Sequence, residues 1–163
     1  MQRIIWSGVI AVMAAVASPS LLLGQAPSGV RAPIVEVTDL DGTLVKLPVA
    51  GRPALIEFWA TWCEVCEQLF PRVVAAKQAY GDRVDFYGIN VTVNESKTRV
   101  KRWVAEHTPP FRVLYDERGT AVRAYGAPAT SYVVIVDAKG IVRYTGSGGT
   151  QALSAELAKV VAR

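Results

Sequence analysis

Apolar and polar residues follow one another along the chain in patterns that predict alternating strands and helices. Two short alternating runs, Ile34 to Val37 and Leu44 to Leu47, flank the turn Asp39-Leu40-Asp41-Gly42, and this arrangement is typical of a β-hairpin. The next run, Ala54 to Ala60, is almost continuously apolar. It predicts a central strand that is buried on both faces.

The chain after this strand continues the alternation. A helix is expected from about Cys63 to Tyr80, with a kink at Pro71, because proline removes a backbone hydrogen bond and clashes with the preceding turn. Ser96 is expected to cap a second helix, which Pro109-Pro110 ends. The other expected elements are a strand Val84 to Val93, a short strand Val113 to Tyr115, a short helix Gly119 to Tyr125, a hairpin of Tyr132 to Val136 with Ile141 to Tyr144, a loop Gly146 to Gly149 and a closing helix Leu153 to Val161. This order predicts an α/β sandwich with helices on both faces of a sheet.

Length and charge narrow the class of protein. The 163 residues favour one domain, and with 51% hydrophobic residues the chain has ample apolar side chains for one packed core. The formal net charge is +4, without a basic run or a basic stripe with interleaved aromatic residues. We therefore expect no nucleic-acid partner.

The first 26 residues differ from the remainder of the chain. Arg3 is their only charged residue, and it precedes the apolar run Ile4 to Val16 and a break at Ser18-Pro19-Ser20. Gly24 and Ala26 place small residues at the −3 and −1 positions of a cleavage site. This layout predicts a secretory signal peptide.

Cleavage after Ala26 would leave a mature domain of residues 27–163. An uncleaved anchor is the alternative, because Ile4 to Leu23 is nearly long enough to span a bilayer. We expect a periplasmic or otherwise extracytoplasmic domain, which would face outward if the leader anchors it in the membrane.

Cys63 and Cys66 are the only cysteines of the chain. Outside the cytosol such a pair normally forms a disulfide, but a loop of two residues gives little stability, so we interpret the pair as a redox centre. Both lie at the predicted start of a helix, where residues three apart share a face and free N–H groups favour a thiolate. Cys63, at the tip, is expected to be exposed and to attack; Cys66, one turn in, is expected to be shielded and to resolve the mixed disulfide.

Zinc binding is another common use of two cysteines at this spacing. A zinc site needs about four ligands, and the chain has no third cysteine and one histidine, His107, distant in sequence. We therefore expect no metal at this pair, and we interpret His107 as an ordinary residue near a helix end.

A family resemblance is carried by the segment Phe58-Trp59-Ala60-Thr61-Trp62-Cys63-Glu64-Val65-Cys66, followed by Pro71. It closely resembles the thioredoxin superfamily, and in particular its exported TlpA/ResA-like branch. The likeness covers nearly all of residues 27–163. It implies the thioredoxin fold: a mixed central sheet with helices on both faces, an N-terminal β-hairpin and a central βα insertion from Asn90 to Tyr125.

The resemblance also implies an activity. Members of this branch are thiol–disulfide oxidoreductases; many are reductants in the periplasm or at the outer face of the cytoplasmic membrane, several in cytochrome c maturation. The chain lacks the large helical insertion of DsbA-like oxidants, which favours a reductant. We expect no cofactor, and the implied partners are substrate proteins with disulfides and a membrane or periplasmic electron-donor protein.

Two carboxylates are candidates for tuning the cysteines. Glu57 lies inside the predicted buried strand, where thioredoxins often carry an acidic residue beneath the resolving cysteine. Desolvation would raise its pKa and let it exchange a proton with Cys66. The alternative is a strand-end glutamate that reaches water or pairs with Lys or Arg. Glu64, seen also in ResA-like proteins, opposes ionisation of Cys63 or is simply a solvated residue favoured by the helix dipole.

One position departs from the family pattern. Thioredoxin-fold proteins usually place a cis-proline opposite the disulfide, and an ungapped count puts Ser131, after Thr130, at that position, with Pro128 three residues too early. Either the loop is re-registered so that Pro128 takes this place, or the proline is absent, which the ungapped spacing favours. We expect Trp62, Thr130 and Ser131 to line the substrate groove. Since a non-proline cis bond costs about 2.5–4 kcal/mol, we predict a trans Thr130–Ser131 peptide.

The missing proline motivates a second hypothesis. The chain would then be a thioredoxin-fold binding or chaperone-like module with little redox turnover. In the family the proline discourages metal capture by the two cysteines, so its loss makes capture of a metal or cluster at Cys63 and Cys66 conceivable.

Overall fold

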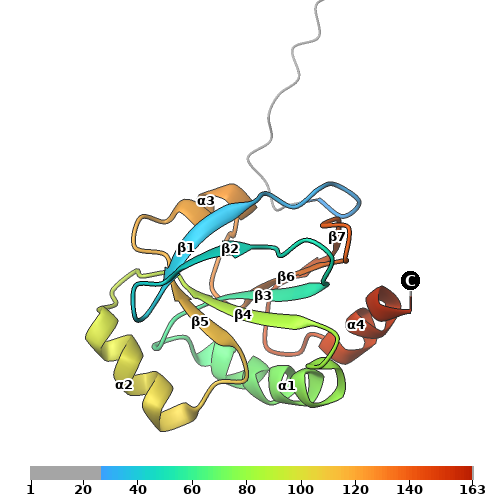
Figure 1. Cartoon of the computed structure of the whole chain (residues 1–163). Helices are drawn as coiled ribbons and strands as arrows, with labels where there is room; N and C mark the ends of the chain where they lie inside the picture. Colours follow the sequence, from blue (N-terminus) through green and yellow to red (C-terminus); the bar gives the residue numbers. More distant parts are fainter. Residues whose placement is uncertain (1–26, 163) are drawn as a thin grey trace, which may run out of the picture.

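A mixed sheet of seven strands forms the centre of the computed structural model, which describes residues 27–162 (Figure 1). Its strands are β1 (Val35–Asp39), β2 (Leu44–Leu47), β3 (Ala54–Trp59), β4 (Asp85–Asn90), β5 (Arg112–Tyr115), β6 (Tyr132–Val136) and β7 (Val142–Gly146). They lie in the order β2-β1-β5-β4-β3-β6-β7. The neighbours β3, β4 and β5 pair in parallel, and the other neighbours pair antiparallel. The predicted mixed sheet and N-terminal hairpin are confirmed.

Helices cover both faces of the sheet. They are α1 (Glu64–Tyr80), α2 (Lys97–His107), α3 (Thr120–Tyr125) and α4 (Leu153–Val161). In Figure 1, α1, α2 and α4 lie on one side of the sheet and α3 lies on the other. The helix α1 continues through Pro71 as one helix of 17 residues. As expected, Ser96 caps α2: its hydroxyl oxygen accepts the Arg99 backbone N–H at 3.2 Å.

The central strand β3 divides its side chains between the two faces. Leu55 and Trp59 belong to the apolar cluster that α1 and α4 cover, whereas Ile56 and Phe58 belong to the cluster on the α3 side. Glu57 has the same parity along the strand as Leu55 and Trp59, so its carboxyl group lies on the α1 side. Every residue of β3 is buried, as predicted.

Several strand ends differ from the prediction, among them those of β4 and β7. The strand β4 ends at Asn90 instead of Val93, because Thr92 and Asn94 have left-handed backbones, with φ of 62° and 53°, which a strand does not accommodate. The strand β7 extends to Gly146, which was expected in a loop, because Gly146 still pairs with a residue of β6. The difference at β4 is important because the loop after this strand contacts the turn that precedes Cys63.

The leader lies outside the described residues. The predicted signal peptide or anchor of residues 1–26 therefore stays a prediction. Within residues 27–162, none of the helices is long and apolar enough to cross a membrane.

Candidate active site

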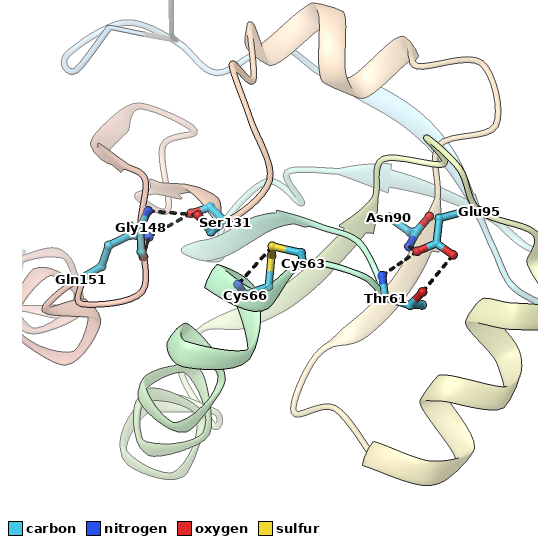
Figure 2. Close-up of a disulfide and its surroundings, with 8 residues drawn as sticks. All are labelled: Thr61, Cys63, Cys66, Asn90, Glu95, Ser131, Gly148 and Gln151. Carbon is cyan, nitrogen blue, oxygen red and sulfur yellow. Dashed lines mark hydrogen bonds between the residues drawn. A yellow bond between two sulfur atoms is a disulfide. The ribbon is translucent and has the colours of Figure 1, made fainter.

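A disulfide joins Cys63 and Cys66 where β3 ends and α1 begins (Figure 2). The two Cα atoms are 5.2 Å apart. Cys63 is the N-cap of α1, and its sulfur accepts the backbone N–H of Cys66 at 3.1 Å. A donor in this position favours a thiolate on Cys63 when the pair is reduced, because the first N–H groups of a helix have no partner within the helix.

Exposure does not distinguish the two cysteines in this disulfide form. Cys63 is 4% exposed and Cys66 is 7% exposed, so the expectation of an exposed Cys63 is wrong here. Because Cys63 is bonded back onto the first turn of α1, both residues join the apolar cluster beneath that helix. Two large hydrophobic residues next to them, Trp62 and Val65, remain exposed, as does the acidic Glu64.

Glu57 lies on the same side of the sheet as the disulfide. The residue is 2% exposed, and burial raises the pKa of its carboxyl group to about 8. Within residues 27–162 the Glu57 side chain makes neither a hydrogen bond nor an ion pair, so the alternative of a glutamate paired with Lys or Arg does not describe this structure. A carboxyl group with this pKa can take up and release a proton near neutral pH.

A cavity of about 330 Å³ connects Glu57 with both cysteines. Its other walls are mostly aromatic: Trp59, Phe70, Trp103, His107 and Phe111. The sequence places Trp59 in the buried strand, but it does not bring Trp103 beside the cysteines, because α2 meets this site only through tertiary packing. The indole Nε1 of Trp59 is buried and has no hydrogen-bond partner in the described part of the chain.

His107 ends α2, as expected, and its ring stacks on Trp103 with 4.3 Å between ring centroids. Its Nδ1 lies 2.9 Å from the backbone oxygen of Trp103. The residue also lines the cavity, a position that sequence reasoning did not foresee. Across residues 27–162, no group of three or more His, Cys, Asp and Glu side chains is arranged to hold a metal ion.

Ser131 stands just before β6 with a trans peptide bond, as predicted; within residues 27–162 the only cis bond joins Leu47 and Pro48. Its backbone is left-handed, with φ of 61°. Its hydroxyl oxygen accepts the Gly148 backbone N–H at 3.0 Å, and its carbonyl oxygen accepts the Gln151 side-chain amide at 2.9 Å. Ser131 is buried and Thr130 is half-buried, so the Ser131 hydroxyl is occupied within the fold.

The loop that Ser131 holds also touches α1. Gly149 packs so closely on that helix that a Cβ atom there would lie 2.6 Å from Cβ of Gln68. The Arg72 guanidinium donates to the Gly149 carbonyl at 3.1 Å. Ser131 is thereby linked through one short loop to the first turns of the helix that carries the cysteines.

On the other side of the disulfide, the turn before Cys63 is held by the loop after β4. Thr61 donates its backbone N–H to Glu95 Oε1 at 2.5 Å and its hydroxyl to Glu95 Oε2 at 3.1 Å. The indole Nε1 of Trp62 donates to the Val93 carbonyl at 2.8 Å, although the side chain is 47% exposed. No sequence signal pointed to Glu95. Glu64 is exposed on the first turn of α1, so both interpretations of that residue stay open.

Comparison with known proteins finds relatives with redox activity. The Redoxin family model matches residues 27–161. The chain is 34% identical over 129 residues to a thiol:disulfide interchange protein DsbE from Pseudomonas fluorescens biotype C, covering 77% of this chain and 66% of that protein. It is 29% identical over 136 residues to a thiol-disulfide oxidoreductase ResA from Bacillus thuringiensis subsp. konkukian, covering 81% and 78%.

A solved structure supports the fold. The thioredoxin domain of a thiol-disulfide oxidoreductase from Bacteroides vulgatus superimposes with a TM-score of 0.70 at 21% identity, covering 82% of this chain and 96% of that domain. The predicted thioredoxin fold is confirmed.

Proposed function

The chain belongs to the Redoxin family and is a thiol:disulfide oxidoreductase, and from this premise we propose that it reduces protein disulfides outside the cytosol. One observation carries the proposal: Cys63 caps α1 and accepts the Cys66 N–H, while both cysteines share a cavity with the buried carboxyl group of Glu57. This arrangement supplies a nucleophile, a second thiol and a proton acceptor in one place.

The exchange would begin with the reduced pair. The Cys63 thiolate attacks one sulfur of a substrate disulfide, forms a mixed disulfide and expels the other substrate sulfur as a thiolate, which takes a proton from water. The Cys66 thiol then loses its proton to the ionised Glu57, and the Cys66 thiolate attacks the Cys63 sulfur. The second substrate thiolate leaves, two electrons have passed to the substrate, and the protein holds the Cys63–Cys66 disulfide.

A dithiol protein at the membrane or in the periplasm would restore the reduced pair. Equilibration of the Cys63–Cys66 couple against glutathione tests the direction of electron flow. Reported potentials of such sites run from about −270 mV for thioredoxin to about −120 mV for DsbA. We expect a value nearer the thioredoxin end, and a value near the DsbA end would contradict a reductant.

Location and pathway belong to the same proposal. The predicted signal peptide supports export, with cleavage after Ala26 or retention as an outward-facing anchor. Amino-terminal sequencing of the exported protein would distinguish these, and a chain that stays in the cytosol would contradict both. Cytochrome c maturation is the pathway we propose to test first, by measuring holocytochrome c in cells without the protein.

A binding or chaperone-like module with little turnover remains the second candidate, because Ser131 stands where a proline is usual. The variants Cys66→Ala and Cys63→Ala separate the two functions. If Cys63 attacks, Cys66→Ala should accumulate mixed disulfides with substrate proteins and Cys63→Ala should not. If neither variant alters function in cells, the binding module is the better description.

A further inference from the structure

The loop between β4 and α2 lies along the turn that precedes Cys63, and a series of hydrogen bonds joins the two. The Val91 N–H donates to the Trp59 carbonyl at 3.0 Å, and the Val93 carbonyl accepts the Trp62 indole N–H at 2.8 Å. The Glu95 carboxylate then accepts hydrogen bonds from the backbone N–H and the hydroxyl group of Thr61. The contacts therefore cover the stretch between the last residue of β3 and the residue before Cys63.

The most direct of these contacts is that between Glu95 and Thr61. The turn closes on itself through the Cys63 N–H, which donates to the Ala60 carbonyl at 3.2 Å. That bond leaves the Thr61 N–H directed out of the turn, where Glu95 Oε1 accepts it at 2.5 Å. Hydrogen bonds to an ionised carboxylate are shorter and stronger than those to a neutral acceptor. Glu95 thus holds this side of the Cys63 turn through two hydrogen bonds to one residue.

A third residue, Asn90, also binds the Glu95 carboxylate. The side-chain amide of the fully buried Asn90 donates to Glu95 Oε1 at 3.3 Å, and Asn90 Oδ1 accepts the Thr92 N–H at 3.0 Å. The left-handed backbones of Thr92 and Asn94 change the direction of this loop. A left-handed backbone is unfavourable for a β-branched residue such as Thr92, and strained positions of this kind persist where the surrounding contacts fix them, often at functional sites.

We propose that Glu95 is a positioning residue for thiol–disulfide exchange, which fixes the turn that presents Cys63 to an incoming disulfide. The proposal rests on Cys63 as the attacking thiolate. It applies most strongly to the reduced protein, because reduction removes the covalent bond to Cys66. The Glu95–Thr61 contact and the Cys66 N–H then hold the Cys63 sulfur in line for attack.

Four variants test this role: Glu95→Ala, Glu95→Asp, Glu95→Gln and, as a control, Glu106→Ala. Alanine removes both acceptors, and aspartate keeps the charge but withdraws the carboxylate by one methylene. Glutamine loses the charge but can still accept the Thr61 N–H and donate to its hydroxyl. Glu106 lies exposed on α2, and its side chain makes no hydrogen bond or ion pair among the described residues.

The measurement is the second-order rate at which each pre-reduced variant reduces the aromatic disulfide 5,5′-dithiobis(2-nitrobenzoate), together with the alkylation rate of Cys63 from pH 5 to 9. We expect Glu95→Ala to react about tenfold more slowly than the parent and Glu95→Asp about fivefold more slowly, because small displacements of a reacting group cost rate steeply. Glu95→Gln should stay within about twofold, and Glu106→Ala should match the parent.

The comparison of aspartate with glutamine decides between position and charge. A Glu95→Gln protein as slow as Glu95→Ala, with Glu95→Asp near the parent, would overturn the proposal, as would parent-like rates in all Glu95 variants. If Glu95→Ala does not fold, the order of Glu95→Asp and Glu95→Gln still decides. Activity that survives in Cys63→Ala would instead contradict the proposed attacking role, whatever the Glu95 variants do.

Discussion

Two hydrogen-bonded networks flank the Cys63–Cys66 disulfide, and they differ in charge (Figure 2). On one side, a half-buried carboxylate, Glu95, binds Thr61 and Asn90. On the other side, neutral groups bind one another: the buried Gln151 donates to the carbonyl groups of Ser131 and Gly148. The charged network holds the turn that leads into Cys63, whereas the neutral network holds a loop at the place where thioredoxin-fold proteins usually have a cis-proline.

The difference predicts what the loss of a hydrogen bond would change in each network. The Glu95 side is partly in water, so a lost contact there can be replaced by solvent and should affect reaction geometry more than stability. On the Ser131 side both Ser131 and Gln151 are buried, so loss of the Gln151 amide leaves the Ser131 carbonyl unsatisfied, and this costs stability directly.

The largest expected effect concerns Glu57, which lies on the α1 side of the sheet and shares a cavity with both cysteines. Burial raises the pKa of its carboxyl group to about 8, from an ordinary value of 4.5. Between these values the folded state keeps a proton that the unfolded state has released. The free energy of unfolding should therefore fall as pH rises from about 4.5 to about 8, by roughly 5 kcal/mol at most.

Chemical denaturation of the disulfide form at several pH values measures this fall, since bonded cysteines do not titrate. In Glu57→Gln the corresponding component of the pH dependence should be absent. Identical pH profiles for the parent and Glu57→Gln would mean that water reaches the carboxyl group, and the cavity could then not supply a proton acceptor of raised pKa.

The next effect in size tests the backbone at Ser131. Proline fixes φ near −65°, whereas Ser131 has φ of 61°. Restoring the family's usual residue with Ser131→Pro should therefore destabilise the protein by about 3 kcal/mol, measured by urea denaturation. Ser131→Gly, which accepts this φ but loses the hydroxyl group, should stay within about 1 kcal/mol of the parent. A Ser131→Pro protein as stable as the parent would show that this loop can adopt the usual cis-proline arrangement.

The elements that could be predicted from sequence are those whose cause is local. The strand β3 is an uninterrupted apolar run, and Glu57, Cys63 and Cys66 lie within ten residues of one another at its end and the start of α1. Their chemistry follows from strand parity and helix-cap geometry, which neighbouring residues determine. The trans bond before Ser131 could be predicted because the cost of a cis bond is intrinsic to the residue type.

The rest depends on contacts between distant segments. Glu95 meets Thr61 across 34 residues, and Gln151 meets Ser131 across 20 residues. No periodicity brings either pair together; the first depends on two left-handed residues in the loop after β4. The expected exposure of Cys63 was wrong for a different reason, since the disulfide holds Cys63 back against the first turn of α1.

A smaller expected effect is the difference in stability lost when one residue of each network is replaced. Gln151→Leu leaves the Ser131 and Gly148 carbonyl groups and the Tyr144 hydroxyl group without their partner. We expect it to lower the free energy of unfolding by about 2 kcal/mol, chiefly the cost of leaving the buried Ser131 carbonyl unsatisfied. Glu95→Gln, on the half-buried side, should lower it by less than about 1 kcal/mol. Equal losses, measured by thermal and urea denaturation, would contradict the distinction between a structural and a positioning network.

The smallest expected effect concerns Glu64, which belongs to neither network and is exposed on the first turn of α1. A negative charge there disfavours a Cys63 thiolate on the adjacent N-cap, but water and salt screen an exposed charge. Glu64→Gln should therefore speed alkylation of Cys63 at neutral pH by about twofold at low ionic strength, and the difference should vanish near 1 M salt. Glu95→Gln, compared under the same conditions, removes a charge that is half-buried and hydrogen-bonded, so any change that it causes should persist in salt. If the Glu64 effect also persisted, Glu64 would act through a contact with the turn that holds Cys63.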